Sequence, residues 1–124
     1  MFNPENAEGR ALREKVCEEG LQDVLDWLEK SDGEVAVFDA TNTTRERRKY
    51  LYRKVVLDKG FKLFFVESIC NDPKIIEANI LEVKITSPDY KHFEKEKVLN
   101  DFLERIKHYE KQYETIDEDL EPGT

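Results

Sequence analysis

Residues 35–48 read VAVFDATNTTRERR and join an apolar run to an acid, a hydroxyl-rich segment and a basic cluster. The β-prone residues 35–38 follow the turn-forming pair Asp32-Gly33, as expected for a buried strand of a parallel sheet. Asp39 comes directly after this strand, and in open α/β sheets ligands bind beyond the carboxyl ends of the strands. Its position therefore makes Asp39 a candidate site residue.

The polar residues from Thr41 to Thr44 have two interpretations. Each of them can cap a helix that begins near Arg45, so the plainest one is a helix start. However, Arg45, Arg47 and Arg48 would all lie near the start of that helix, where the macrodipole disfavours cations. Because guanidinium groups suit phosphate oxygens, the cluster predicts either an external anion or simply a solvated helix face.

The length and charge of the chain limit the kinds of function that it can have. A chain of 124 residues fits one domain with a modest core, and its net charge of −8 argues against a general nucleic-acid or anionic-membrane surface. Residues 45–54 nevertheless hold six basic residues and one acidic residue. This local charge favours a small anionic substrate.

The cysteines and the hydropathy predict a cytoplasmic protein without a membrane span. Cys17 and Cys70 form neither a disulfide framework nor a CxxC pattern, which indicates a reducing compartment. No apolar run approaches the roughly 20 residues of a transmembrane helix, and the N-terminus has no basic-then-apolar signal.

Predicted helices and strands alternate along the chain. A first helix begins at residues 3–6 and ends near residues 31–33, and a basic helix runs from Arg45 to Gly60. Residues 62–68, KLFFVES, are typical of a central strand. Two parallel strands joined by a helix predict a right-handed βαβ unit and hence an α/β fold.

Two more helices and a tail complete the prediction. Asp72-Pro73 caps and opens a helix that runs to about Val83, and the last helix runs from about Phe93 to Glu114. The acidic segment 117–124 contains Gly and Pro, so we expect it to be flexible. Residues 1–116 would then form the domain.

Four motifs in this order resemble one family. FDATNTTRERR at 38–48, FFVESIC at 64–70, Val83-Lys84 and SPDY at 87–90 are similar to the kinase domain of the 6-phosphofructo-2-kinase/fructose-2,6-bisphosphatase family. The resemblance covers essentially the whole chain. It implies the C-terminal part of a P-loop kinase-type, three-layer α/β/α domain with parallel strands.

The resemblance also implies an activity that contributes to the control of glycolysis. Members transfer the γ-phosphoryl group of ATP to the 2-hydroxyl of fructose 6-phosphate, with Mg²⁺, and so make fructose 2,6-bisphosphate. Asp39 matches the active-site aspartate that works beside the magnesium ion and the sugar hydroxyl. Cys70 matches an active-site cysteine, here taken as lining the site; a buried structural cysteine is the other interpretation.

The remaining implied site residues fall into two groups. Those that would hold fructose 6-phosphate are Thr41, Arg47, Lys84, Arg105 and Tyr109. Those that would border ATP are Asn79, Ile80, Leu81, Glu82, Val83 and Lys84.

The chain also departs from the family pattern. It contains no GxxxxGK[ST] loop, the motif that cradles ATP phosphates. We therefore expect the isolated chain to make no fructose 2,6-bisphosphate, and we expect unpaired strands to favour a homo-oligomer. Between Arg48 and Cys70 it is one residue longer than the pattern.

Two other classes of protein stay open at this point. An aspartyl-phosphate hydrolase of the haloacid dehalogenase type also places an acid after an apolar strand, but it would have a second aspartate where Thr41 stands. The other is a non-catalytic sugar-phosphate-binding or regulatory module.

Overall fold

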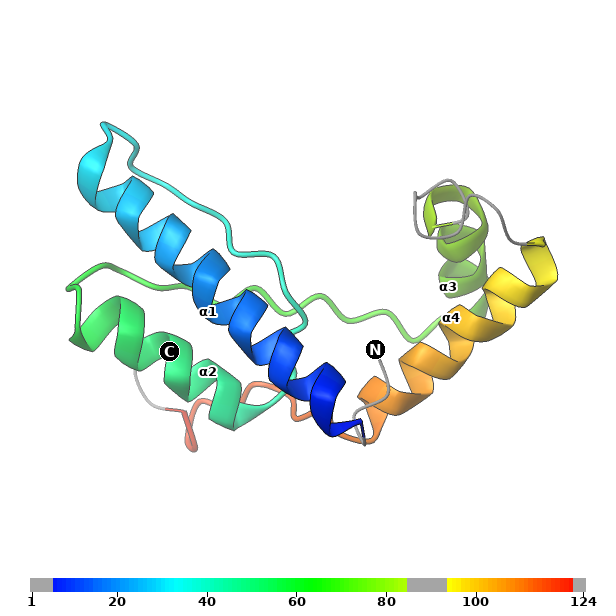
Figure 1. Ribbon diagram of the computed structural model, residues 1–124. Helices are drawn as coiled ribbons and strands as arrows, with labels where there is room; N and C mark the ends of the chain where they lie inside the picture. The colour runs from blue at the N-terminus through cyan, green and yellow to red at the C-terminus, as the bar shows by residue number, and fades with distance from the viewer. Residues whose placement is uncertain (1–5, 85–93, 122–124) are drawn as a thin grey trace. The chain divides into compact units, whose positions relative to one another are not determined.

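The computed structural model describes residues 6–84 and 94–121, in two compact units (Figure 1). Unit 1 comprises residues 1–65 and 112–124, and unit 2 comprises residues 66–111. In the part of the chain that is described, no helix is both long and apolar enough to span a membrane.

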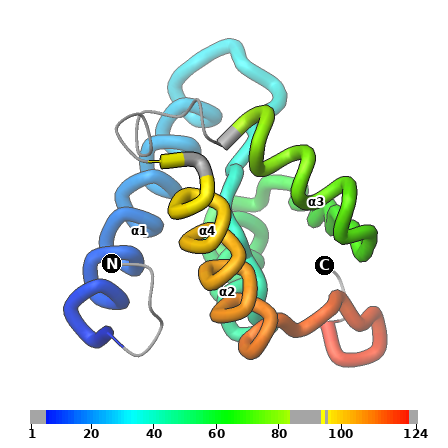
Figure 2. The backbone as a smooth tube through the Cα atoms, turned by 90° about the vertical axis from the view of Figure 1, so that its right-hand side faces the viewer, coloured from blue at the N-terminus to red at the C-terminus, as the bar shows by residue number. Residues whose placement is uncertain are grey.

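Unit 1 is built on two predicted helices, and both are confirmed. Helix α1 spans Ala7–Lys30, and its N-cap Asn6 accepts a hydrogen bond from the Gly9 amide at 3.1 Å. After α1 the chain turns and runs back along this helix (Figures 1 and 2). Helix α2 spans Arg45–Tyr52 and is capped by Thr44, as the polar run predicts.

Helix α2 continues into a π-helix, η1, which spans Arg53–Leu57. The Asp58 amide donates to the Arg53 carbonyl oxygen at 2.9 Å, a bond that closes over five residues instead of four. Such a turn accommodates one additional residue, and η1 lies in the interval where the sequence predicts one. The turn that follows η1 ends at Gly60, whose φ of 74° is left-handed and suits a residue without Cβ.

The core of unit 1 lies between these helices. Leu21 and Leu25 of α1 pack with Leu51 of α2 and Val55 of η1, and all four are buried. The aromatic and aliphatic side chains that pack around this cluster include Phe38, Tyr50, Val56, Phe61, Leu63 and Phe65. The cluster therefore joins α1, the basic helix and the two predicted strands into one unit.

The predicted parallel sheet is not confirmed. Residues 35–38 and 62–68 are extended, but no strand occurs within residues 6–84 and 94–121. A strand requires a ladder of hydrogen bonds to a neighbouring segment, and neither run makes one with a described residue.

Burial in these runs nevertheless alternates as it would in a strand. Phe38 and Phe65 pack on the core, whereas Val35, Val37 and Phe64 are 78%, 84% and 82% exposed. One face of each run therefore packs against the helices, whereas apolar side chains on the other face are exposed.

Unit 2 contains the other two predicted helices. Helix α3 spans Pro73–Asn79, with Asp72 as N-cap, and continues into the π-helix η2 at Ile80–Lys84. Helix α4 spans Lys95–Glu110 and packs against η2. Ile80 and Val98 are buried. The SPDY motif at 87–90 lies outside the described residues.

Part of the C-terminal segment that was expected to be flexible makes contacts with the rest of unit 1. Residues 117–121 form a turn in which the amides of Asp119 and Leu120 donate to the Asp117 carboxylate. Glu121 is only 8% exposed. Folding of this segment follows from its contacts with α2, described below, which composition alone does not reveal.

Candidate functional site

The loop between residues 39 and 44 presents polar side chains at the start of α2. Asp39 and Thr41 are exposed, and their side chains make no hydrogen bond to any described residue. Asn42 has a φ of 42°, a left-handed conformation that Asn tolerates better than most residues. Thr44 then caps α2, since its Oγ1 accepts a hydrogen bond from the Arg47 amide at 3.2 Å.

The arginines of α2 differ in their partners. Arg45 donates from its guanidinium to the Glu114 carboxylate at 2.8 Å, and Arg48 donates from Nε to Glu121 Oε1 at 2.7 Å. These two arginines therefore bind carboxylates of the chain itself, whereas the sequence pattern predicted an external anion or a solvated helix face. Arg47 is half-buried, and its guanidinium forms no ion pair with a described residue. Arg47 is therefore the cation of this cluster that remains available.

Sequence reasoning missed the two acids. Glu114 and Glu121 lie in a segment that was expected to end a helix or to be flexible, yet both face the basic helix. The hydrogen bond from Arg48 lowers the pKa of the Glu121 carboxyl from its usual value of 4.5, against the opposing effect of burial. The signal that could have found them is charge complementarity between an acidic tail and a basic helix.

The residues implied to border ATP lie on α3 and η2 in unit 2. Asn79 ends α3 and is exposed, Ile80 is buried, and the other described side chains of η2 are exposed. The side chain of Lys84 lies outside what the structure describes. The buried position of Ile80 makes it a packing residue, so a nucleotide contact would have to come from its exposed neighbours.

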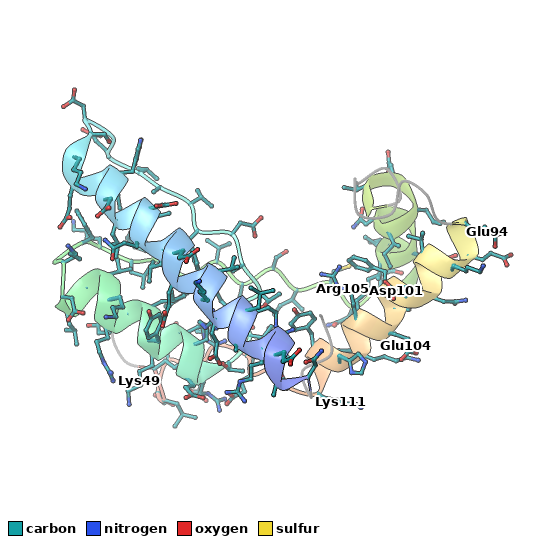
Figure 3. The ribbon with its side chains drawn as sticks, in the orientation of Figure 1. Lys49, Glu94, Asp101, Glu104, Arg105 and Lys111 are labelled. Carbon is teal, nitrogen blue, oxygen red and sulfur yellow. The ribbon has the colours of Figure 1, made fainter. Side chains whose placement is uncertain are left out.

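Arg105 and Tyr109 lie one turn apart on α4 and are both half-buried. The Arg105 guanidinium carbon lies 5.2 Å from the centre of the Phe102 ring, within the range of a cation–π contact. Figure 3 labels Arg105 together with Asp101, one turn earlier on the same helix. The structure therefore places both residues on one helix, as predicted, while their role in binding the sugar phosphate stays a prediction.

Cys70 lies in unit 2, before α3, and is exposed. The interpretation of Cys70 as a buried structural cysteine is therefore wrong. The residue follows an extended run that buries only alternate side chains, so its thiol is open to solvent. An exposed position is compatible with a residue that lines a site.

The candidate residues lie neither in a metal-binding cluster of described residues nor in the hollow that lies between α1 and α2. Among the described residues, no group of three or more His, Cys, Asp or Glu side chains could hold a metal ion. A hollow of about 260 Å³ lies between α1 and α2, and its lining includes Leu21, Leu25, Tyr50 and Lys54. None of the predicted site residues lines it, so the hollow is not the candidate site.

Comparison with known proteins identifies the family. Residues 1–122 match the 6-phosphofructo-2-kinase family. The chain is 51% identical over 121 residues to 6-phosphofructo-2-kinase/fructose-2,6-bisphosphatase 1 of Rattus norvegicus, and 49% identical over 123 residues to the enzyme of Gallus gallus. These alignments cover 98% and 99% of the chain but 26% of each relative. The chain belongs to the 6-phosphofructo-2-kinase family.

Proposed function

We propose that this chain supplies the sugar-phosphate-binding part of a 6-phosphofructo-2-kinase. The complete protein would transfer the γ-phosphoryl group of ATP to the 2-hydroxyl of fructose 6-phosphate in the cytoplasm. Apart from family membership, one observation carries the proposal: Arg47 has no carboxylate partner among the described residues, although Arg45 and Arg48 beside it both form ion pairs with carboxylates. A guanidinium without a described carboxylate partner, on a helix that follows exposed carboxylate and hydroxyl side chains, is suited to a phosphorylated sugar.

The residues of unit 1 would have two roles, substrate binding and proton transfer. Arg47 and Thr41 would donate hydrogen bonds to the phosphate of fructose 6-phosphate. The Asp39 carboxylate would accept the proton of the attacking 2-hydroxyl, because a carboxylate within hydrogen-bond reach can act as a general base. Phosphoryl transfer depends mostly on positioning and charge stabilisation, and these three side chains would provide part of both.

The donor set of unit 1 fits a magnesium ion that is shared with ATP. Mg²⁺ is commonly held by one or two carboxylates together with substrate phosphates and several waters. The Asp39 carboxylate is exposed and accepts no hydrogen bond from a described residue, so its oxygens are available. When bound, the ion would neutralise charge on the phosphates.

Unit 2 would supply the other substrate contacts. Arg105, Tyr109 and Lys84 are assigned to the sugar phosphate, and residues 79–84 to the nucleotide, by their match to the family. The support in the structure is that Arg105 and Tyr109 lie on the same side of α4, one turn apart. Cys70 would line the site, without a role as nucleophile.

In the complete protein, residues 35–38 and 62–68 would become parallel strands of a three-layer α/β/α domain. Their alternating burial supports this, since each run already packs one face on the helices.

Calorimetric titration of the chain with fructose 6-phosphate tests the sugar site. We expect saturable binding that weakens at higher salt, because the contacts are ionic. Arg47→Ala should reduce the affinity at least about tenfold, the size of one lost charge-assisted hydrogen bond. Lys49→Ala, which removes an exposed cation from the same helix (Figure 3), is the matched control and should bind like the wild type. Equal losses in both variants would contradict a specific role for Arg47.

A further inference from the structure

Arg48 ties three separate segments of unit 1 together. Its guanidinium donates from Nε and Nη2 to both carboxylate oxygens of Glu121, at 2.7 and 3.0 Å. Nη1 donates to the Asn42 carbonyl oxygen at 3.0 Å, and Nη2 also donates to the Glu114 carbonyl oxygen at 2.8 Å. Arg48 is 3% exposed, so these contacts are shielded from water.

The contact with Asn42 falls at the turning point of the candidate loop. Among the described residues other than glycine, Asn42 alone has a positive φ, and it lies directly after Thr41. A second bond holds the same loop, because the Glu114 amide donates to the Thr43 carbonyl oxygen at 2.8 Å. The loop is thus fixed by the C-terminal segment and by α2, while the Thr41 side chain stays exposed.

We propose that Arg48 and Glu121 are positioning residues of the sugar-phosphate site, and that residues 114–121 act as a strap that shapes the loop. This inference rests on the proposed function for its ligand. The bidentate pair holds the Arg48 fork in one orientation, which keeps its Nη1 on the Asn42 carbonyl oxygen. The loop can then present Thr41 and Arg47 in one arrangement, and a preorganised site loses less entropy on binding.

Glu121→Gln in the full chain tests this role with two readouts. The first is the affinity for fructose 6-phosphate by calorimetry, which we expect to fall about tenfold. The second is the set of backbone amide NMR signals of residues 41–44, which should shift or broaden as the loop samples other conformations, while the signals of α1 stay in place. The control is Glu29→Gln, which breaks the ion pair with Lys59 far from the loop in sequence and should change neither readout.

The outcomes separate this proposal from the function on which it rests. If Glu121→Gln keeps the wild-type loop signals and the wild-type affinity, the positioning role is refuted. If the wild type does not bind fructose 6-phosphate, the proposed function fails, and the loop signals alone decide whether the strap shapes the loop. Should Glu121→Gln not fold, Arg48→Lys retains the positive charge without the fork and is measured in the same way. Unchanged loop signals in that variant would overturn the proposal.

Discussion

Glu121 is a buried acid whose charge is compensated by a hydrogen-bonded ion pair with Arg48. Its carboxylate is satisfied by Arg48 and by the Asp117 amide, at 2.7 and 3.1 Å respectively. Removing one partner of a buried pair leaves the other charge unpaired, which typically costs about 3–5 kcal/mol. The pair therefore couples the last described residue to the second helix of the chain, a separation of 73 residues.

This environment predicts how stability depends on pH. The pKa of Glu121 is lower in the folded chain than its usual 4.5, chiefly because of the hydrogen bond with Arg48. The unfolded chain therefore binds the proton first, and the stability that Glu121 contributes is present above about pH 4.5 and is lost as pH falls through the folded pKa. We expect Glu121→Gln to be less stable than the wild type at neutral pH, with a difference that shrinks in acid.

Urea unfolding of both proteins, from neutral pH to about pH 3, measures this difference. Glu29→Gln serves as the control, since its partly exposed ion pair with Lys59 is screened by water and contributes little to stability. A difference between the wild type and Glu121→Gln that grows in acid would contradict the assignment.

At the scale of elements, helix ends depend on local chemistry. Gly60 has a φ of 74°, and a Cβ added there would meet no atom within 4 Å. The cost of Gly60→Ala is therefore purely one of backbone conformation, and we expect a loss of about 1–2 kcal/mol. Gly20, inside α1, is the matched control: its added Cβ would lie 3.7 Å from the Phe38 ring, an ordinary contact. Gly20→Ala should stabilise the chain by about 0.5–1 kcal/mol.

Thermal unfolding of the two glycine variants measures whether each substitution raises or lowers the stability of the chain. Opposite shifts of the midpoint are expected, downward for Gly60→Ala and upward for Gly20→Ala. A stabilising effect at Gly60 would mean that the turn is not left-handed in solution.

At the scale of the whole molecule, the uncovered apolar side chains of unit 1 predict self-association. Val37 and Phe64 are each more than four-fifths exposed and lie in extended runs that form no hydrogen-bond ladder with a described residue. Exposed apolar surface of this kind, next to unpaired backbone, favours contact between copies. We expect concentration-dependent oligomers of the chain, and fewer of them for Val37→Thr combined with Phe64→Thr.

Sedimentation velocity over a range of concentrations measures the effect. Threonine retains β-propensity, and the replaced side chains are exposed, so the unfolding midpoint should change little. Val16→Thr, at an exposed apolar position of α1, is the control and should leave association unchanged. Association that persists in the double variant would place the contact elsewhere.

The four helices, the caps of the first three and the family membership were predictable from the sequence. Asn6, Thr44, Asp72 and Gly60 act within a few residues of their own positions, so their effects can be read from local sequence. The candidate residues Asp39, Thr41 and Arg47 were found in the same way, and their roles stay proposals.

Tertiary contacts, in contrast, were needed to learn which arginines have carboxylate partners and whether the extended runs have partners for a hydrogen-bond ladder. Arg45, Arg47 and Arg48 are chemically alike in sequence, but Glu114 and Glu121 reach two of them across roughly seventy residues, which no local pattern predicts. Likewise, β-prone residues become a strand only when another segment completes their hydrogen bonds. The physical reason is the same in both cases: a cap is satisfied by its neighbours in sequence, whereas an ion pair or a ladder requires a partner that folding must bring from elsewhere in the chain.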